Sequence, residues 1–90
     1  MVLFEARLMS RKEKLYAKIQ QNPSNVRYEE LRTLLEMCGY VLRPSGGGSH
    51  RWFNKPGCEP IHFPEHRPVG SVYVKKALRI LEKNCDFNDD

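Results

Sequence analysis

The stretch of this chain that is best equipped for chemistry covers residues 43–53 and reads RPSGGGSHRWF. Its three glycines, Gly46, Gly47 and Gly48, lead through Ser49 into a histidine, His50. An imidazole titrates near neutral pH, so it can take or give a proton without a metal ion. A glycine-rich backbone can approach a phosphate closely and point its N–H groups at the anion. The stretch therefore indicates chemistry on a phosphate-containing substrate.

RNA is the substrate for which such a site must supply the fewest groups, because the 2′-hydroxyl of RNA lies next to the phosphate to be cut. The protein must supply a base for that hydroxyl, cations for the phosphate and a surface that aligns the backbone. We expect His50 to be the general base and Arg51 to position the phosphate together with the glycines. Trp52 could stack an unpaired base. The other residues expected to contact RNA are Ser49, Lys55, Lys75, Lys76 and Arg79.

Each of these signals also has a plainer interpretation. Three glycines in a row form a flexible hairpin more often than a phosphate loop. Trp52 is favoured for core packing because aromatic side chains are usually buried, and the basic residues could form a solvated face. Zinc at Cys58, His62 and His66 is disfavoured, since Cys58 and His62 would lie roughly 13 Å apart on an extended strand. We therefore expect neither a metal nor a cofactor.

Three helices are predicted around this stretch. The capping box of Ser10–Glu13 predicts a first helix over residues 11–21. Apolar residues at the spacing of a single buried stripe predict the other two helices, over residues 28–38 and 71–83. Gly39 follows the second helix and provides its C-terminal cap.

Three short strands are expected between the second and third helices, over residues 40–43, 49–54 and 60–64. Their short loops favour an antiparallel meander. The chain is thus predicted to be an α+β domain, with a small three-stranded antiparallel sheet and helices on one of its faces. Alternation places His50 and Trp52 on the same side of their strand but does not say whether that side is the open one.

The length, charge and cysteine content of the chain limit the classes of protein to which it can belong. The 90 residues hold no apolar run near the ~18 that a membrane span needs, and we expect a single cytoplasmic domain over residues 10–85. It is preceded by an extension, residues 1–9, and followed by an acidic tail, residues 86–90. Residues 43–83 contain eight Lys or Arg against three Glu, which favours nucleic acid as a partner. An odd number of cysteines without a CxxC motif predicts reduced thiols.

Four motifs in order cover about Val26 to Glu82. They are YEELRTLLEMCGYVLR, the Gly-Ser-His of Gly48–His50, the Pro-x-His of Pro64–His66 and an amphipathic closing helix. This combination resembles the HicA toxins of toxin–antitoxin systems. The resemblance implies a fold similar to the double-stranded-RNA-binding domain and a ribonuclease that cleaves mRNA, with His50 as its catalytic histidine. It also implies a HicB-type antitoxin as a partner that covers His50.

The chain departs from the family pattern at Arg51, where many members carry a second histidine. An arginine keeps a cation near the phosphate but cannot transfer protons at neutral pH. If the second histidine matters for the chemistry, His66 or water would have to act as the acid. The helix over residues 11–21 and the segment before it are also additions to the family pattern.

Two other functions stay open on the sequence. One is a non-catalytic RNA-binding module of the double-stranded-RNA-binding type, which would bind RNA in a salt-dependent way whether or not His50 is present. The other is an interaction protein whose open sheet face serves a protein partner, with negligible affinity for RNA.

Overall fold

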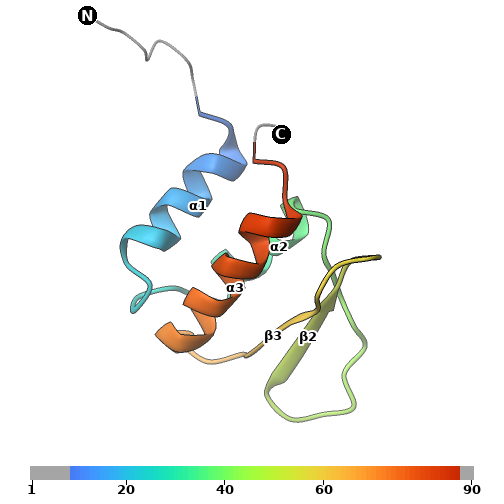
Figure 1. The fold of residues 1–90 in the computed structure, drawn as a ribbon. Helices are drawn as coiled ribbons and strands as arrows, with labels where there is room; N and C mark the ends of the chain where they lie inside the picture. The colour runs from blue at the N-terminus through green and yellow to red at the C-terminus, as the bar shows by residue number, and fades with distance from the viewer. Residues whose placement is uncertain (1–8, 88–90) are drawn as a thin grey trace, which may run out of the picture.

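The helices and strands follow one another in the order predicted from the sequence (Figure 1). The structure is a computed structural model that describes residues 9–87. Residues 1–8 of the predicted extension and residues 88–90 of the predicted tail lie outside the described part. The elements in chain order are α1 (Arg11–Gln21), α2 (Tyr28–Met37), β1 (Val41–Leu42), β2 (His50–Asn54), β3 (Ile61–Pro64) and α3 (Ser71–Asn84).

The three strands form one antiparallel sheet in the order β1–β2–β3, which confirms the predicted α+β fold. In the ladder between β2 and β3, Trp52 lies opposite His62 and Phe53 lies opposite Ile61. Strand β1 is shorter than predicted. The N–H of Arg43 still donates to the carbonyl of Trp52 at 2.8 Å beyond its end. The next residue is a proline, which has no N–H for the ladder.

Local signals set the bounds of the first two helices as expected. At the start of α1, the Ser10 hydroxyl accepts the N–H of Glu13 and the Glu13 carboxylate accepts the N–H of Ser10, each at 3.0 Å. The predicted capping box is therefore present. After α2, Gly39 has a φ of +92°, a conformation that side chains rarely allow.

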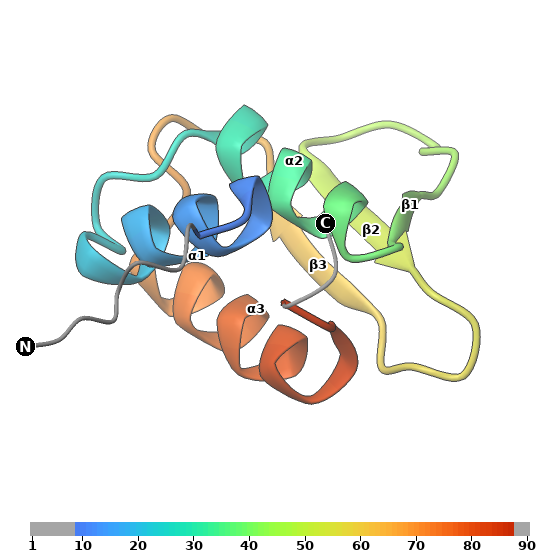
Figure 2. The ribbon, with the colours of Figure 1, turned by 90° about the horizontal axis from the view of Figure 1, so that it is seen from above.

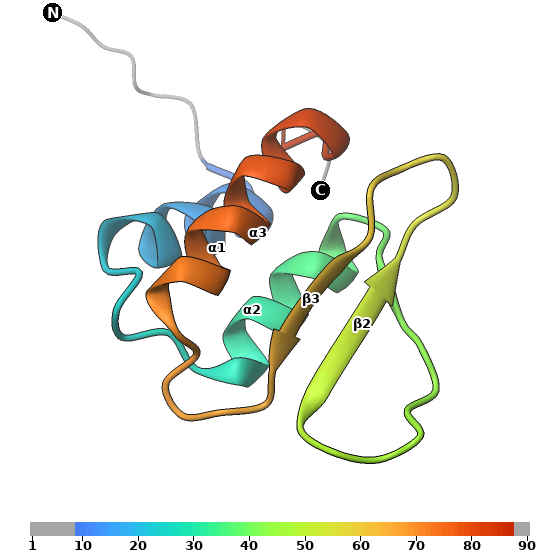
Figure 3. The same ribbon diagram turned by 60° about the horizontal axis from the view of Figure 1, so that its bottom comes forward.

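One face of the sheet is packed against the helices. Phe53, Ile61 and Phe63 on this face are at most 2% exposed, and the rings of Phe53 and Phe63 stack with their centroids 5.1 Å apart. The helices contribute the stripes that the periodicity predicted, including Leu31, Leu34, Leu35, Val74, Ala77 and Leu81. Figure 2 shows the helices grouped together with β2 and β3 beside them, and Figure 3 shows the loop between β1 and β2 far from α1.

The prediction of reduced thiols is wrong for Cys38 and Cys85, which form a disulfide with their Cα atoms 5.2 Å apart. The bridge joins the residue after α2 to the residue after α3, because both helices end at the same side of the core. A separation of 47 residues gives no sign of this proximity in the sequence. A crosslink that closes a loop of this size typically adds about 2–4 kcal/mol to stability. Cys58 is a free thiol, as predicted.

The chain after α3 returns to α1. The Lys12 ammonium donates to the carbonyl of Asp86 at 2.9 Å, and the Ser10 hydroxyl donates to the carbonyl of Phe87 at 3.3 Å. The ring of Phe87 lies 4.6 Å from that of Tyr16. The first two residues of the predicted acidic tail therefore lie against the first helix.

Candidate functional site

The open face of the sheet carries the histidine singled out in the sequence. Phe53 and Phe63 point into the core, so their neighbours Trp52 and His62 point to the opposite face. His50, two residues before Trp52, shares that face and is exposed. Trp52 itself is 39% exposed, so the interpretation of this residue as core packing is wrong.

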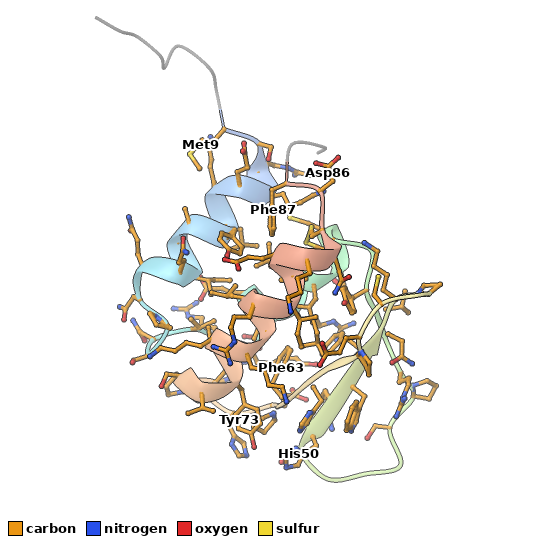
Figure 4. All side chains as sticks on the ribbon, in the orientation of Figure 1. Met9, His50, Phe63, Tyr73, Asp86 and Phe87 are labelled. Carbon is orange, nitrogen blue, oxygen red and sulfur yellow. A yellow bond between two sulfur atoms is a disulfide. The ribbon has the colours of Figure 1, made fainter. Side chains whose placement is uncertain are left out.

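His62 is at the centre of a cluster of rings on this face. Its imidazole stacks on the indole of Trp52 with centroids 4.4 Å apart and an interplanar angle of 14°. The imidazole of His50 lies 5.6 Å from that of His62, and Tyr73 of α3 meets His62 edge-on at 5.7 Å. We call His50, Trp52, His62 and Tyr73 the aromatic cluster. Figure 4 shows His50 and Tyr73 at the same end of the molecule, opposite Met9.

The indole of Trp52 has a neighbour on each side. His62 stacks on it from β3, and the guanidinium carbon of Arg43, at the end of β1, lies 5.3 Å from the indole centroid. Because β2 is the central strand, these two neighbours approach from opposite sides. An RNA base that stacked on this indole, as predicted for Trp52, would first have to displace Arg43. The exposed part of the ring is therefore its edge.

The electrostatics of the cluster disfavour a proton on His62. Burial lowers the pKa of His62 below its ordinary value, and the nearby charges of His50 and Lys76 lower that pKa further. Two imidazolium ions this close would repel each other. Two imidazoles side by side on an exposed face can supply both a base and an acid to one substrate, which is what acid–base catalysis requires.

The loop that contains Gly46, Gly47 and Gly48, called the glycine loop from here on, lies beside His50. Gly47 and Gly48 have φ angles of +128° and +73°, which explains the need for glycine at both positions. The Ser45 hydroxyl accepts the N–H of Gly47 at 3.1 Å and donates to the Gly47 carbonyl at 3.2 Å, so this N–H is used within the loop. The loop walls a cavity of about 260 Å³ whose lining includes Arg43, Gly46, His50 and Trp52.

The structure does not bring Arg51 to the open face. Its side chain alternates with those of His50 and Trp52, and its guanidinium pairs with Glu65 at 3.0 Å. It also donates to the carbonyl of Gly48 at 2.7 Å. Arg51 thus holds the glycine loop against the segment after β3. Ser49 has a similar role, since its carbonyl accepts the N–H of Glu65 at 2.7 Å.

The other predicted basic residues separate into two groups. Lys76 lines a cavity together with Trp52 and His62, and Arg79 lines the next cavity along α3. Lys75 instead lines a groove between α3 and α1. Lys55 donates to the carbonyl of Asn84 at 2.6 Å, at the end of α3. Lys76 is therefore the predicted cation that borders the aromatic cluster, whereas Arg79 lies further along α3 and also borders the groove that Lys75 lines.

His66, the expected auxiliary acid, lies in the loop after β3 and is exposed. Within the described residues, no ring contact or side-chain hydrogen bond joins His66 to His50. The second imidazole beside His50 is His62, which the sequence suggested only as a poor zinc ligand. Its position depends on the register between β2 and β3, so the signal that could have found it is the short turn that pairs these strands.

No group of three or more His, Cys, Asp or Glu residues within residues 9–87 could hold a metal ion. In the same part of the chain, no helix has both the length and the apolar character needed to cross a membrane. The fold and the cluster define a small α+β domain that presents paired imidazoles on the open face of its sheet. No protein-family model, no curated protein and no solved structure matches this chain.

Proposed function

We propose that this protein is a metal-independent RNA endonuclease of the HicA toxin type, acting on mRNA in the cytoplasm. The observation that supports this proposal is the pair of imidazoles, His50 and His62, whose centroids lie 5.6 Å apart on an exposed face. RNA cleavage through its own 2′-hydroxyl needs one base and one acid beside a cation. Arg43 and Lys76 border this face on either side of the pair.

In the proposed reaction, His50 takes the proton of the 2′-hydroxyl while the 2′-oxygen attacks the adjacent phosphorus. The bond from phosphorus to the 5′-oxygen breaks, and His62 donates its proton to that oxygen. The products are a 2′,3′-cyclic phosphate and a 5′-hydroxyl. The lowered pKa of His62 makes its protonated ring a stronger acid than an ordinary imidazolium. The same shift means that only a minority of molecules at neutral pH hold the reactive state, in which His62 carries the proton.

The deciding experiment compares the wild type with His50→Ala, His62→Ala and His66→Ala on single-stranded RNA in EDTA. Loss of either ring of the pair should lower the cleavage rate by roughly 10²–10⁴-fold, the usual contribution of a general acid or base. His66→Ala is the matched control and should cleave like the wild type. If His50→Ala cleaves as fast as the wild type, or if neither cleaves, the proposal fails. Binding without cleavage would support a non-catalytic RNA-binding module instead.

The roles of the two histidines can be separated with an RNA analogue whose leaving group needs no protonation, such as a nucleoside 3′-(p-nitrophenyl phosphate). His62→Ala should then recover most of the wild-type rate, because the acid is no longer required. His50→Ala should stay slow, because the 2′-hydroxyl still needs its base. The reverse pattern would exchange the two roles and leave the nuclease proposal intact.

A HicB-type antitoxin that covers His50 is part of the same proposal. Val41 and Trp52 are 67% and 39% exposed, and they give an accessible apolar surface to the face of the sheet that carries His50, although Val41 pairs with Asn54 at the other end of β2. Such a partner should protect RNA from the wild type when the two proteins are mixed. The substitution Val41→Lys should weaken that protection while leaving cleavage by the free protein unchanged.

A further inference from the structure

A second cavity lies between β3 and α3, on the other side of the aromatic cluster from the glycine loop. It has a volume of about 320 Å³. Trp52 and His62 border it, and the apolar residues Ile61, Ala77 and Ile80, each at most 6% exposed, form its base. We call it the β3–α3 cavity. None of the proposed proton transfers uses it.

The size and lining of this cavity suit a flat ring. Small-molecule sites typically have volumes of about 300–1,000 Å³, so this cavity is at the small end and fits one ring system. The apolar base favours a planar ligand that packs one of its faces against Ile61, Ala77 and Ile80, with Trp52 and His62 at its border. A nucleobase is such a ligand, and RNA that reaches His50 brings nucleobases to this face.

The polar groups at the border of the cavity indicate which edge the ring presents. Glu59 and Lys76 both line it, and within residues 9–87 neither side chain makes a hydrogen bond or an ion pair. A carboxylate is an acceptor only, with two oxygens side by side. Guanine offers two adjacent donors on its pairing edge, N1–H and N2–H. In the other bases the donor on the pairing edge has only acceptors beside it, so they match a carboxylate less well.

We propose that the β3–α3 cavity binds one unpaired guanine of the RNA substrate, with its pairing edge toward the Glu59 carboxylate. This inference rests on the proposed function and deepens it, because a base can enter the cavity only when it is unpaired. The substrate is therefore single-stranded at this position. A cavity of about 250 Å³ follows along α3, and its lining includes the basic residues Lys76, Arg79 and Lys83 together with the acidic residues Glu59 and Glu82. In this proposal the three cations meet the phosphates next to the bound base.

The test uses Trp52, which is the single tryptophan of the chain and borders the cavity. Its fluorescence, excited at the red edge of its absorption, is followed while GMP, AMP, CMP or UMP is added to the whole protein. All four nucleotides should change the emission in a saturable way. GMP should bind roughly tenfold more tightly than the others, which is the discrimination typical of one two-point contact to a base edge.

Substitutions of three exposed residues test where on the protein the nucleotides bind. Glu59→Gln should bring the affinity for GMP down to that of the other nucleotides, because one acceptor oxygen becomes a donor. Lys76→Met should lower the affinity for all four nucleotides alike, because it removes a positive charge beside the phosphate. Lys75→Met is the matched control, since Lys75 lies in the groove between α3 and α1, and it should change nothing.

The inference is overturned if no nucleotide binds, or if Glu59→Gln keeps the preference for GMP. It is also overturned if N-acetylphenylalanine amide binds more tightly than GMP, which would make the cavity a site for a protein side chain. His50→Ala separates this inference from the nuclease proposal, because it should bind GMP like the wild type. Cleavage without GMP binding would overturn only the proposed base site. GMP binding without cleavage would overturn only the proposed nuclease activity.

Discussion

The two faces of β2 place neighbouring residues in opposite surroundings. Phe53 is fully buried and stacks on Phe63 among the apolar residues of the helices. Trp52, one residue earlier, is also stacked on a ring, yet it is 39% exposed and has a cation beside it. Burial explains the first stack, because it removes apolar surface from water. It does not explain the second, where a large aromatic side chain is kept at the surface together with two histidines.

The aromatic residues of the two faces have different physical roles. The core face stabilises the fold, so its residues can be replaced only by other apolar ones of similar size. We expect the open face to contribute less to stability, because its rings and cations are exposed where a ligand can reach them. Changes on the two faces should therefore affect different measurements.

The largest expected difference is between Phe53→Ala and Trp52→Ala. Removing the buried ring of Phe53 should lower the free energy of unfolding by about 3–5 kcal/mol, because it leaves a cavity in the core. Trp52→Ala should cost about 1 kcal/mol, the value of a stacking contact at a partly exposed site. Urea denaturation of both variants measures this difference. Equal costs would show that the open face stabilises the fold as much as the core face does.

The core face is the part of the molecule that the sequence predicts well. The stripe of Leu31, Leu34 and Leu35 follows from local periodicity, and the capping box of Ser10 states where α1 begins. The helix and strand boundaries accordingly fall within one or two residues of those expected. These signals lie within a few residues of each other, so no knowledge of distant contacts is needed to find them.

The open face was predicted less completely, because its contacts join distant segments. His62 meets His50 only through the register of two strands, and Tyr73 joins them from the last helix. Arg51 looked like a phosphate ligand from its position beside His50. Its ion pair with Glu65 depends on how the chain leaves β3. A sequence shows which residues are charged, but it does not show which of these charges form ion pairs within the fold.

The basic residues allow the same comparison to be made by RNA binding. Lys76→Ala removes a charge on the open side and should reduce the salt dependence of RNA binding by about one unit of slope. Arg51→Ala removes a charge that is paired with Glu65, so the slope should stay unchanged although the glycine loop loses a contact. RNA affinity measured over a range of salt concentrations gives both slopes. A larger change of slope for Arg51→Ala than for Lys76→Ala would show that Arg51 contacts RNA after all.

The glycine loop offers a matched pair of substitutions before His50. Gly48→Ala should lower the free energy of unfolding by roughly 1–2 kcal/mol, because the φ of +73° is in the left-handed region. Gly46 has open space around it and no positive φ, so Gly46→Ala should leave stability unchanged or raise it by up to about 1 kcal/mol. Chemical denaturation compares the two. Equal effects would mean that the loop does not hold the conformation in which it borders His50.

The smallest expected effect is the pH dependence that His62 adds to stability. The pKa of His62 is lowered in the folded protein from an ordinary value of 6.5, chiefly by burial and then by the charges of His50 and Lys76. Above pH 6.5 the ring is neutral in both states, so the folded protein keeps its full stability. As the pH falls through 6.5, the unfolded chain binds a proton that the folded protein disfavours, and the free energy of unfolding decreases.

Urea denaturation of the wild type and of His62→Gln at about pH 8 and about pH 5 isolates this effect, since every other titrating group is common to both proteins. The wild type should lose more stability on acidification than His62→Gln. An equal loss would show that the ring of His62 titrates as freely as in the unfolded chain. The open face would then lack the coupling between its two imidazoles, and the acid–base pair would have to be sought elsewhere on the sheet.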